Sequence, residues 1–197
     1  MLRLYCVYSI IDGSGTAIKL EAVGSIEFIS THQLILSDHD NYCILELDMN
    51  SLTFSVFAGE CGGNSGHQDG HRLTEAKLVN PGDLQRLDSV VYLLSEMLLK
   101  IIDLTTDILT TTTTFEYDPV KFVLDSNSML VYLIHPANQI DILNLENNTI
   151  QKLVGTTSDE SGLLSTGTFN ETRFDAPKDM AFLADNLLLV CNYKGDR

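Results

Sequence analysis

The sequence lacks the features that assign a chain to several broad functional classes. No apolar run approaches the roughly eighteen residues that a bilayer-spanning helix needs, so membrane insertion is not expected. Basic residues are scarce, with 12 Lys and Arg against 27 Asp and Glu and a formal net charge of −15. Because nucleic-acid affinity comes largely from Lys and Arg that neutralise phosphates, this balance disfavours nucleic acid as a partner.

Motifs of common catalytic sites are also missing. No Lys directly follows a glycine in the glycine-rich stretch 57–73, which is therefore not a Walker A phosphate loop. There is no G-x-S-x-G elbow, and no Ser or Cys stands in a recognisable motif with a His, so nucleophilic catalysis is not indicated. No C-x-x-C occurs, which disfavours a zinc ribbon or a thioredoxin-type redox pair.

The four cysteines, Cys6, Cys43, Cys61 and Cys191, are widely and irregularly spaced. Three of them lie within apolar runs, where a free cysteine behaves as a small buried hydrophobe, and we expect buried thiols there. Cys61 lies among glycines and is expected to be exposed. The cysteine pattern thus suggests neither a zinc site nor a redox pair.

What the sequence does contain is an internal repeat. Gly59 precedes Pro81 by 22 positions, and Gly155 precedes Pro177 by the same interval. The two copies lie 96 positions apart, so an intermediate copy is expected between them, and Pro119 begins it. A pair of short apolar segments follows each of these prolines.

The repeat defines units near 25–59, 81–114, 119–155 and 177–197, with 1–24 as half of a further unit. Their apolar segments are short, and they alternate with polar residues or are β-branched. They end at Asn, Asp, Ser or Gly. This pattern indicates strands rather than helices.

Four segments need individual interpretation. Leu87–Asp103 has the length of a helix, but its end matches a strand of the first unit in register, so we expect two strands. Thr110–Thr114 is β-branched throughout and predicts an outer strand. Residues 12–15, Asp-Gly-Ser-Gly, predict a hairpin turn because Gly readily takes positive φ. Residues 1–11 predict an outer strand, since they lack a convincing signal-peptide core and cleavage site.

Four short strands in every 40–50 residues are the pattern of a β-propeller blade. We therefore expect an all-β fold in which four-stranded antiparallel blades form one domain over residues 1–197. The half units at the two ends permit either a ring of about four blades or a partial arc of a larger propeller. We favour the arc, and with it a fragment of a longer protein, because the sequence stops within the repeat motif at Arg197.

The motifs resemble those of the NHL-repeat propeller family over residues 24–197. In that family an Asp-Gly pair precedes Ala-x-Phe-x-x-Pro, and an apolar strand then leads to V-x-D-x-x-N-x-x-I. Here Asp69-Gly70 precedes "AKLVNP" (76–81), and "LSDHDNYCI" (36–44) carries the second motif. WD40 and kelch repeats fit less well, because the chain has no Trp and no double glycine within a strand. The resemblance implies structural roles for Asp38, Asn41, Asp69, Gly70, Pro81, Pro119, Asn138 and Pro177.

The stretch 57–73, "FAGECGGNSGHQDGHRL", leaves two interpretations open. His67, Asp69 and His71 are spaced i, i+2, i+4, so on an extended segment they share a face and offer the N, O, N ligands of a zinc site. However, the matching stretch before Pro177 has no His, and glycine-rich connections mostly serve to turn the chain. A connection between blades is therefore the main hypothesis, and a divalent metal site is the minor one.

Two further histidines and two sequons complete the candidates. His135 takes the place of Asp38 in its unit, and we expect both His135 and His39 to be structural. The triplets Asn147-Asn148-Thr149 and Asn170-Glu171-Thr172 are N-glycosylation sequons. They leave the compartment undecided but favour an extracellular over a cytoplasmic one.

The function expected from these patterns is non-enzymatic: a scaffold that binds a protein or glycan partner through its interblade loops, without a cofactor. The alternative is a metal-dependent lyase or hydrolase that uses the propeller channel, by analogy with NHL-type peptide-amidating lyases, which hold a metal with His residues. RNA binding, as in tripartite-motif NHL proteins, requires a basic face and is disfavoured by the charge of −15.

Overall fold

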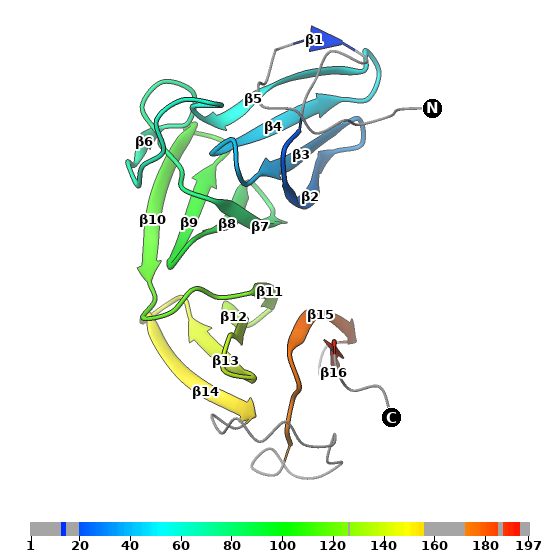
Figure 1. Ribbon diagram of the computed structural model, residues 1–197, viewed down its shortest axis with the longest axis vertical. Coiled ribbons are helices and arrows are strands. Elements are labelled where there is room, and N and C mark those ends of the chain that lie inside the picture. The colour runs from blue at the N-terminus through cyan, green and yellow to red at the C-terminus, as the bar shows by residue number, and fades with distance from the viewer. Residues whose placement is uncertain (1–12, 15–19, 126, 156–171, 185–186, 194–197) are drawn as a thin grey trace. The chain divides into compact units, whose positions relative to one another are not determined.

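The computed structural model describes residues 13–14, 20–125, 127–155, 172–184 and 187–193. Within these ranges the protein has sixteen strands and no helix (Figure 1). The expected fold class, all-β with antiparallel blades, is confirmed. This part of the chain accordingly offers no helix with the length and apolarity of a membrane crossing.

The chain divides into two compact units, Met1–Thr114 and Phe115–Arg197, and each is considered by itself. The first unit holds two sheets of five strands. The first sheet, in the order β1-β5-β4-β3-β2, consists of β1 (Gly13–Ser14), β2 (Val23–Ser30), β3 (Gln33–Asp38), β4 (Cys43–Asp48) and β5 (Thr53–Gly59). The second sheet, in the order β6-β10-β9-β8-β7, consists of β6 (Gly70–His71), β7 (Pro81–Leu87), β8 (Val90–Ser95), β9 (Leu98–Asp103) and β10 (Ile108–Thr114).

The two sheets of the first unit enclose a shared apolar core. Alternate residues of the strands β3, β4, β8 and β9 point into it, as the period-two sequence pattern requires. Ile35 and Ile44 of the first sheet and Leu93 and Ile102 of the second are fully buried there. Leu78, from the segment before β7, fills the same core. This segment therefore helps to hold the two sheets together.

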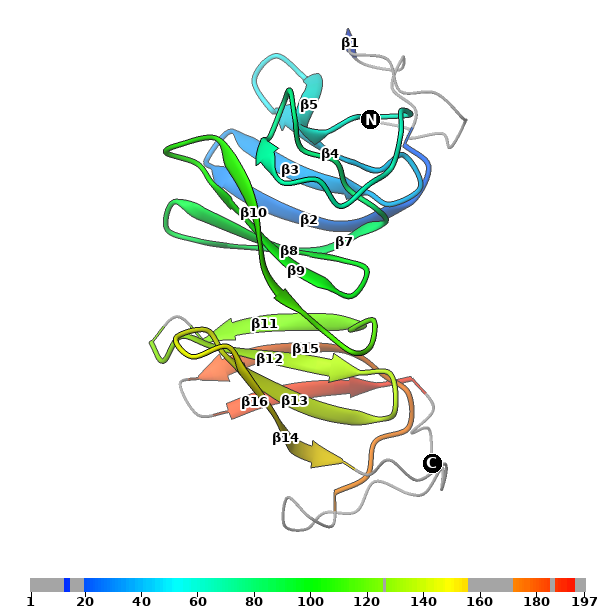
Figure 2. The same cartoon turned by 90° about the vertical axis from the view of Figure 1, so that its left-hand side faces the viewer.

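The second unit holds one four-stranded sheet and a hairpin. The third sheet runs in the order β11 (Lys121–Asp125), β12 (Leu130–His135), β13 (Gln139–Asn144) and β14 (Thr149–Gly155). The hairpin consists of β15 (Pro177–Ala184) and β16 (Leu187–Asn192) and packs against the third sheet (Figure 2). Ile134 and Ile140 of the sheet share a core with Met180 of the hairpin.

The same irregularity occurs in β5, β10 and β14, the last strand in chain order of each of these three sheets. The ladder between β4 and β5 shifts register at Phe57, which has no partner on β4, and Thr112 in β10 and Leu153 in β14 are the equivalent residues. Each is the extra residue of a β-bulge. In β5 the bulge turns two consecutive side chains, Phe57 and Ala58, into the shared core.

The two glycines aligned by the repeat are also equivalent in the structure. Gly59 and Gly155 end β5 and β14 with φ of 84° and 105°. A Cβ atom on them would lie 2.8 Å and 2.6 Å from the carbonyl oxygens of Tyr42 and Asn138, so both positions require glycine. Gly59 pairs with Cys43, and Gly155 pairs with Gln139. Asn138 is therefore the structural equivalent of Tyr42, one residue away from the equivalent of the motif residue Asn41.

A third repeated detail lies at the ends of β4, β9 and β13, the strands that precede β5, β10 and β14 in the chain. There Asp48, Asp103 and Asn144 accept hydrogen bonds from the backbone N–H groups two and three residues further on, at 2.7 to 3.3 Å. Such side-chain bonds favour a tight turn into the next strand. The repeat predicted from the sequence is therefore present in the backbone itself.

Two of the four individually interpreted segments agree with the structure. Leu87–Asp103 forms β8 and β9, and Thr110–Thr114 lies within β10. The predicted turn at 12–15 is wrong where the structure describes it: Gly13 and Ser14 form β1, because the outer edge of β5 offers backbone groups for them to pair with. The outer strand expected over residues 1–11 lies outside the described residues.

Candidate binding surface on the interblade connection

The candidate site is the segment between β5 and β7, residues 60–80, which we call the interblade connection. It includes β6, which pairs with the outer edge of β10 (Figure 1). Backbone hydrogen bonds fix its course: the N–H groups of Gly62 and Gly66 donate to the carbonyl oxygens of Asn41 and Leu78 at 3.0 and 3.2 Å. The connection is thus built into the first unit along its length.

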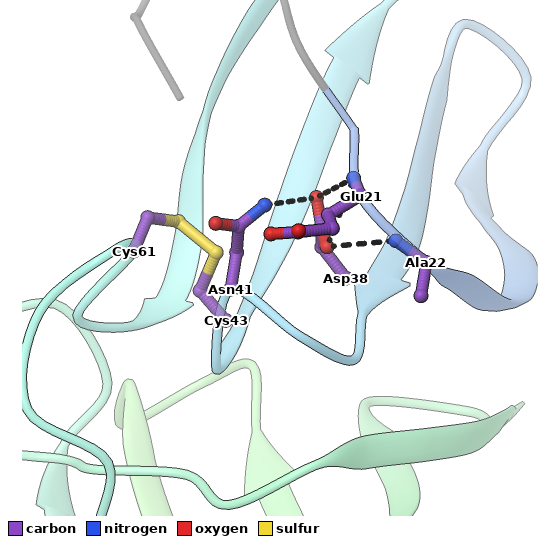
Figure 3. The surroundings of a disulfide bond; sticks show 6 residues. All are labelled: Glu21, Ala22, Asp38, Asn41, Cys43 and Cys61. Atoms are coloured by element: carbon purple, nitrogen blue, oxygen red, sulfur yellow. Dashed lines mark hydrogen bonds between the residues drawn. A yellow bond between two sulfur atoms is a disulfide. The ribbon is translucent and has the colours of Figure 1, made fainter. Parts of the chain in front are cut away.

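A disulfide joins the start of the connection to the first sheet (Figure 3). Cys61 bonds to Cys43, the fully buried first residue of β4, across a sequence separation of 18. The predicted free thiols are wrong here, because only the pairing of Cys43 with Gly59 brings the two cysteines together. Cys191 is free but exposed, contrary to expectation, since it lies on the outward face of β16. Cys6 lies outside the described residues.

Asp69, one of the three candidate metal ligands, is held by the second sheet. Lys100 Nζ donates to Asp69 Oδ1 at 2.7 Å, and Thr111 donates its N–H to Oδ2 and its hydroxyl to Oδ1, both at 2.8 Å. The Lys100 side chain is 0% exposed, so Asp69 balances a buried positive charge. Burial opposes ionisation of Asp69, but the bonds from Lys100 and Thr111 outweigh it and hold the pKa of the carboxyl below its usual value.

Arg72 fastens the connection at a third place. Its Nε donates to Asp107 Oδ1 at 2.7 Å, and one guanidinium nitrogen donates to the carbonyl oxygen of Phe57 at 2.6 Å. The guanidinium also lies 4.4 Å from the centroid of the Phe57 ring, within the range of a cation–π contact. The bond from Arg72 lowers the pKa of Asp107. Arg72 thus links the connection to both sheets of the first unit.

His67 and His71 do not converge with Asp69. His67 Nε2 lies 3.2 Å from Glu96 Oε2, and His71 Nδ1 accepts a hydrogen bond from the N–H of Leu73 at 3.3 Å. Over the residues that the structure describes, no group of three or more His, Cys, Asp or Glu side chains is arranged to hold a metal ion. The zinc hypothesis gains no support from these positions.

Asp38 and Asn41 form a buried polar cluster beside the disulfide (Figure 3). The backbone N–H groups of Glu21 and Ala22 donate to the Asp38 carboxylate at 3.2 to 3.4 Å, and Asn41 Nδ2 donates to it at 3.0 Å. Asp38 therefore ties the end of β3 to the segment that leads into β2. Ser95 takes the same position in the second sheet and exchanges hydrogen bonds with the backbone just before β7.

The other residues implied by the NHL resemblance lie at element boundaries. Gly70, in β6, has φ of 137°, and a Cβ atom there would lie 2.6 Å from a glutamate oxygen. Asn138 Oδ1 accepts the N–H of Ala176 at 3.0 Å and so connects the third sheet to the segment before β15. The prolines lie at strand starts or two residues before one: Pro81, Pro119 and Pro177.

The remaining candidates have local partners or lie apart from the connection. His39 is half-buried and its Nδ1 lies 2.6 Å from Asp40 Oδ1, and His135 Nδ1 accepts the N–H of Ala137 at 2.9 Å. Asn147 is exposed in the turn between β13 and β14. Asn170 lies outside the described residues.

Beside the exposed charged residues Glu60, Asp69 and Glu75, the connection exposes a short stretch that is polar and uncharged. Residues 62–65, Gly-Gly-Asn-Ser, and the side chain of Gln68 are exposed between the disulfide and the Lys100–Asp69 pair. Amide and hydroxyl groups can both donate and accept hydrogen bonds. A segment of this kind, fixed on both sides, can recognise the polar groups of a partner.

Comparisons with known proteins extend to the fold alone. No protein-family model and no curated protein matches the chain. Among solved structures, a structural genomics protein of unknown function from Bacteroides thetaiotaomicron is similar over 84% of this chain, with a TM-score of 0.58 and 10% identity. This chain spans 40% of that protein's length.

Two computationally designed proteins are similar to a lower degree. Ika4 and Ika8 each give a TM-score of 0.51 at 12% identity, over 89% and 92% of this chain. The matches cover 88% of Ika4 and 45% of Ika8. At such identities only the backbone arrangement is shared. The protein therefore has a propeller-like all-β fold, built from antiparallel sheets that repeat in sequence and in backbone detail.

Proposed function

We propose that this protein is a non-enzymatic interaction scaffold that binds a protein or glycan partner through its interblade connection. The observation that carries the proposal is an exposed polar segment whose neighbouring residues are bonded to the sheets of the first unit. The Cys43–Cys61 disulfide, the buried Lys100–Asp69 pair and Arg72 hold residues 60–80, while residues 62–65 stay exposed.

A segment fixed in this way loses little conformational freedom on binding. Ordering a mobile loop opposes association, because each immobilised side chain costs about 0.5–1.5 kcal/mol. Binding residues are often found on loops that a rigid scaffold positions. The first unit supplies both conditions, and the exposed residues 62–65 and Gln68 carry neutral groups suited to directional hydrogen bonds.

We further propose that the repeats are of the NHL type and that the protein acts in an oxidising compartment. The family motif supplies Asp38 and Asn41, which join neighbouring segments, and Asp69, which balances Lys100. Disulfides persist in secreted and lumenal proteins and are rare in a reducing cytosol. The Cys43–Cys61 bond therefore supports the extracellular location that the sequons favour.

A matched pair of variants tests the scaffold. Asn64→Arg places a bulky charge on the exposed segment, and Gln151→Arg makes the same change on the exposed face of β14. Immobilised wild type and variants are screened on a glycan array and by capture from extracellular fluid with mass-spectrometric identification. We expect Asn64→Arg to lose a partner's signal more than tenfold and Gln151→Arg to keep it. Equal binding by all three folded proteins would refute the role of the connection.

A further inference from the structure

The turn between β13 and β14 presents a sequon in a defined geometry. Asn147, Asn148 and Thr149 are all exposed, and Asn148 has φ of 55°. Asn144 Oδ1 accepts the backbone N–H of Asn147 at 3.2 Å and fixes the start of the turn. The triplet therefore lies at the surface in a single conformation that its own side chains stabilise.

The side chains of the sequon are bonded to each other. Asn147 Oδ1 accepts the Thr149 hydroxyl at 2.6 Å and the Thr149 N–H at 3.1 Å. Both bonds orient the carboxamide. Asn147 is exposed, and within the described residues its Nδ2 makes no hydrogen bond that would compete with modification.

Among the described residues no strand pairs with the outer edge of β14, the strand that follows this turn, whereas the corresponding edges of β5 and β10 are paired. The outer edge of β5 pairs with β1, and that of β10 pairs with β6, whereas β14 is the last strand of the third sheet. Ile150, the second residue of β14, is 40% exposed. Exposed strand edges invite pairing with other chains, and proteins commonly block them.

We infer that Asn147 carries an N-linked glycan that shields the outer edge of β14. The amide nitrogen attacks the anomeric carbon of a lipid-pyrophosphate-linked oligosaccharide; the C–N bond forms, the C–O bond to phosphate breaks, and the nitrogen loses one proton. The lipid pyrophosphate leaves as the other product. This inference rests on the oxidising secretory compartment of the proposed function.

The first sheet provides a matched test of the geometry. Ser51 takes the place of Asn147 there: its N–H bonds to Asp48, its hydroxyl lies 2.6 Å from that of Thr53, and Leu52 has φ of 55°. Ser51→Asn completes a sequon in a turn of the same form. If the geometry governs modification, this variant gains a second glycan at the equivalent place.

The experiment secretes the full chain from eukaryotic cells and maps glycosylated peptides by mass spectrometry before and after enzymatic deglycosylation. We expect a glycan at position 147 in the wild type and in Asn148→Gln, its loss in Asn147→Gln and Thr149→Val, and retention in Thr149→Ser. Asn147→Gln should form at least twofold more aggregate than Asn148→Gln in light scattering of the secreted proteins.

The outcomes separate the inference from the proposed function. An unmodified Asn147 in secreted wild type with an intact Cys43–Cys61 bond overturns the glycan and leaves the compartment standing. Equal aggregation of Asn147→Gln and Asn148→Gln overturns the shielding role. Reduced Cys43 and Cys61 in protein from its natural source would instead refute the compartment, independently of the variants.

Discussion

Lys100 is the residue whose environment is least expected from its chemistry. A lysine with 0% exposure requires a counter-charge and further hydrogen-bond acceptors, and Asp69 and Thr111 provide them. The pair joins β9 to the interblade connection, 31 positions earlier in the chain. Asp69 thus has a structural role, because it neutralises the buried Lys100 side chain.

Replacing Asp69 with Ala should destabilise the protein by about 2–3 kcal/mol, because the buried ammonium of Lys100 loses its counter-ion. This value allows for screening by water, since the Asp69 side chain is 39% exposed. Thr111→Val, which removes only the hydroxyl, should cost about 1 kcal/mol. Urea unfolding followed by circular dichroism measures both. Equal, negligible effects would contradict the structural role of the pair.

The contribution of Asp69 to stability should also depend on pH. The pKa of Asp69 is lowered in the folded state, so its contribution to stability is present above its unfolded pKa of about 3.9 and is lost as pH falls through the folded value. The free energy of unfolding of wild type, measured over the range from about pH 5 to about pH 2, should therefore fall more steeply than that of Asp69→Ala. Parallel curves for the two proteins would argue against an ionised Asp69.

At the scale of elements, the disulfide fastens the interblade connection to β4. Cross-links stabilise a fold mainly by restricting the unfolded chain, and a loop of this length corresponds to about 3 kcal/mol. We expect Cys61→Ser to lower the free energy of unfolding by about that amount. A reductant should destabilise wild type equally and leave the variant unchanged.

Cys191→Ser is the control for this measurement, because Cys191 is exposed and unpaired. Its free energy of unfolding and its response to reductant should match those of wild type. If Cys191→Ser and Cys61→Ser behave alike, the cross-link does not stabilise the connection.

At the scale of the whole molecule, the net charge leads us to expect no polyanionic partner. A net charge of −15 repels polyanions, since affinity for nucleic acid depends on the release of counterions by Lys and Arg. We expect no saturable binding of single-stranded RNA in a filter-binding titration at about 50 mM salt, where such contacts are strongest. A basic RNA-binding protein serves as the positive control. Tight, salt-sensitive retention of RNA would show that a local basic face overrides the net charge.

The sequence predicts the repeating strands because their signal is local. Alternating apolar residues and the Gly59-to-Pro81 interval are visible within short windows, and the structure places β2 to β5 and β7 to β16 accordingly. The fastening of the candidate site depends on contacts across strands. The partners of the Cys43–Cys61 and Lys100–Asp69 pairs lie 18 and 31 positions apart, so neither pair forms a short motif, and only strand register brings each pair together. The cysteine spacing alone therefore left the disulfide unpredicted.

Phe57 is an extra residue in β5 that has no partner on β4. Its presence changes the effect that deleting one residue from the strand would have. Removing a residue from a regular strand turns every later side chain to the opposite face. Removing Phe57 would instead join Val56 to Ala58, which already face opposite sides of the first sheet. The loss would be confined to one core side chain, with the register intact. Thr112 and Leu153 hold the same place in β10 and β14, so each of these strands also has a point at which its length can change by one residue while its facing pattern persists.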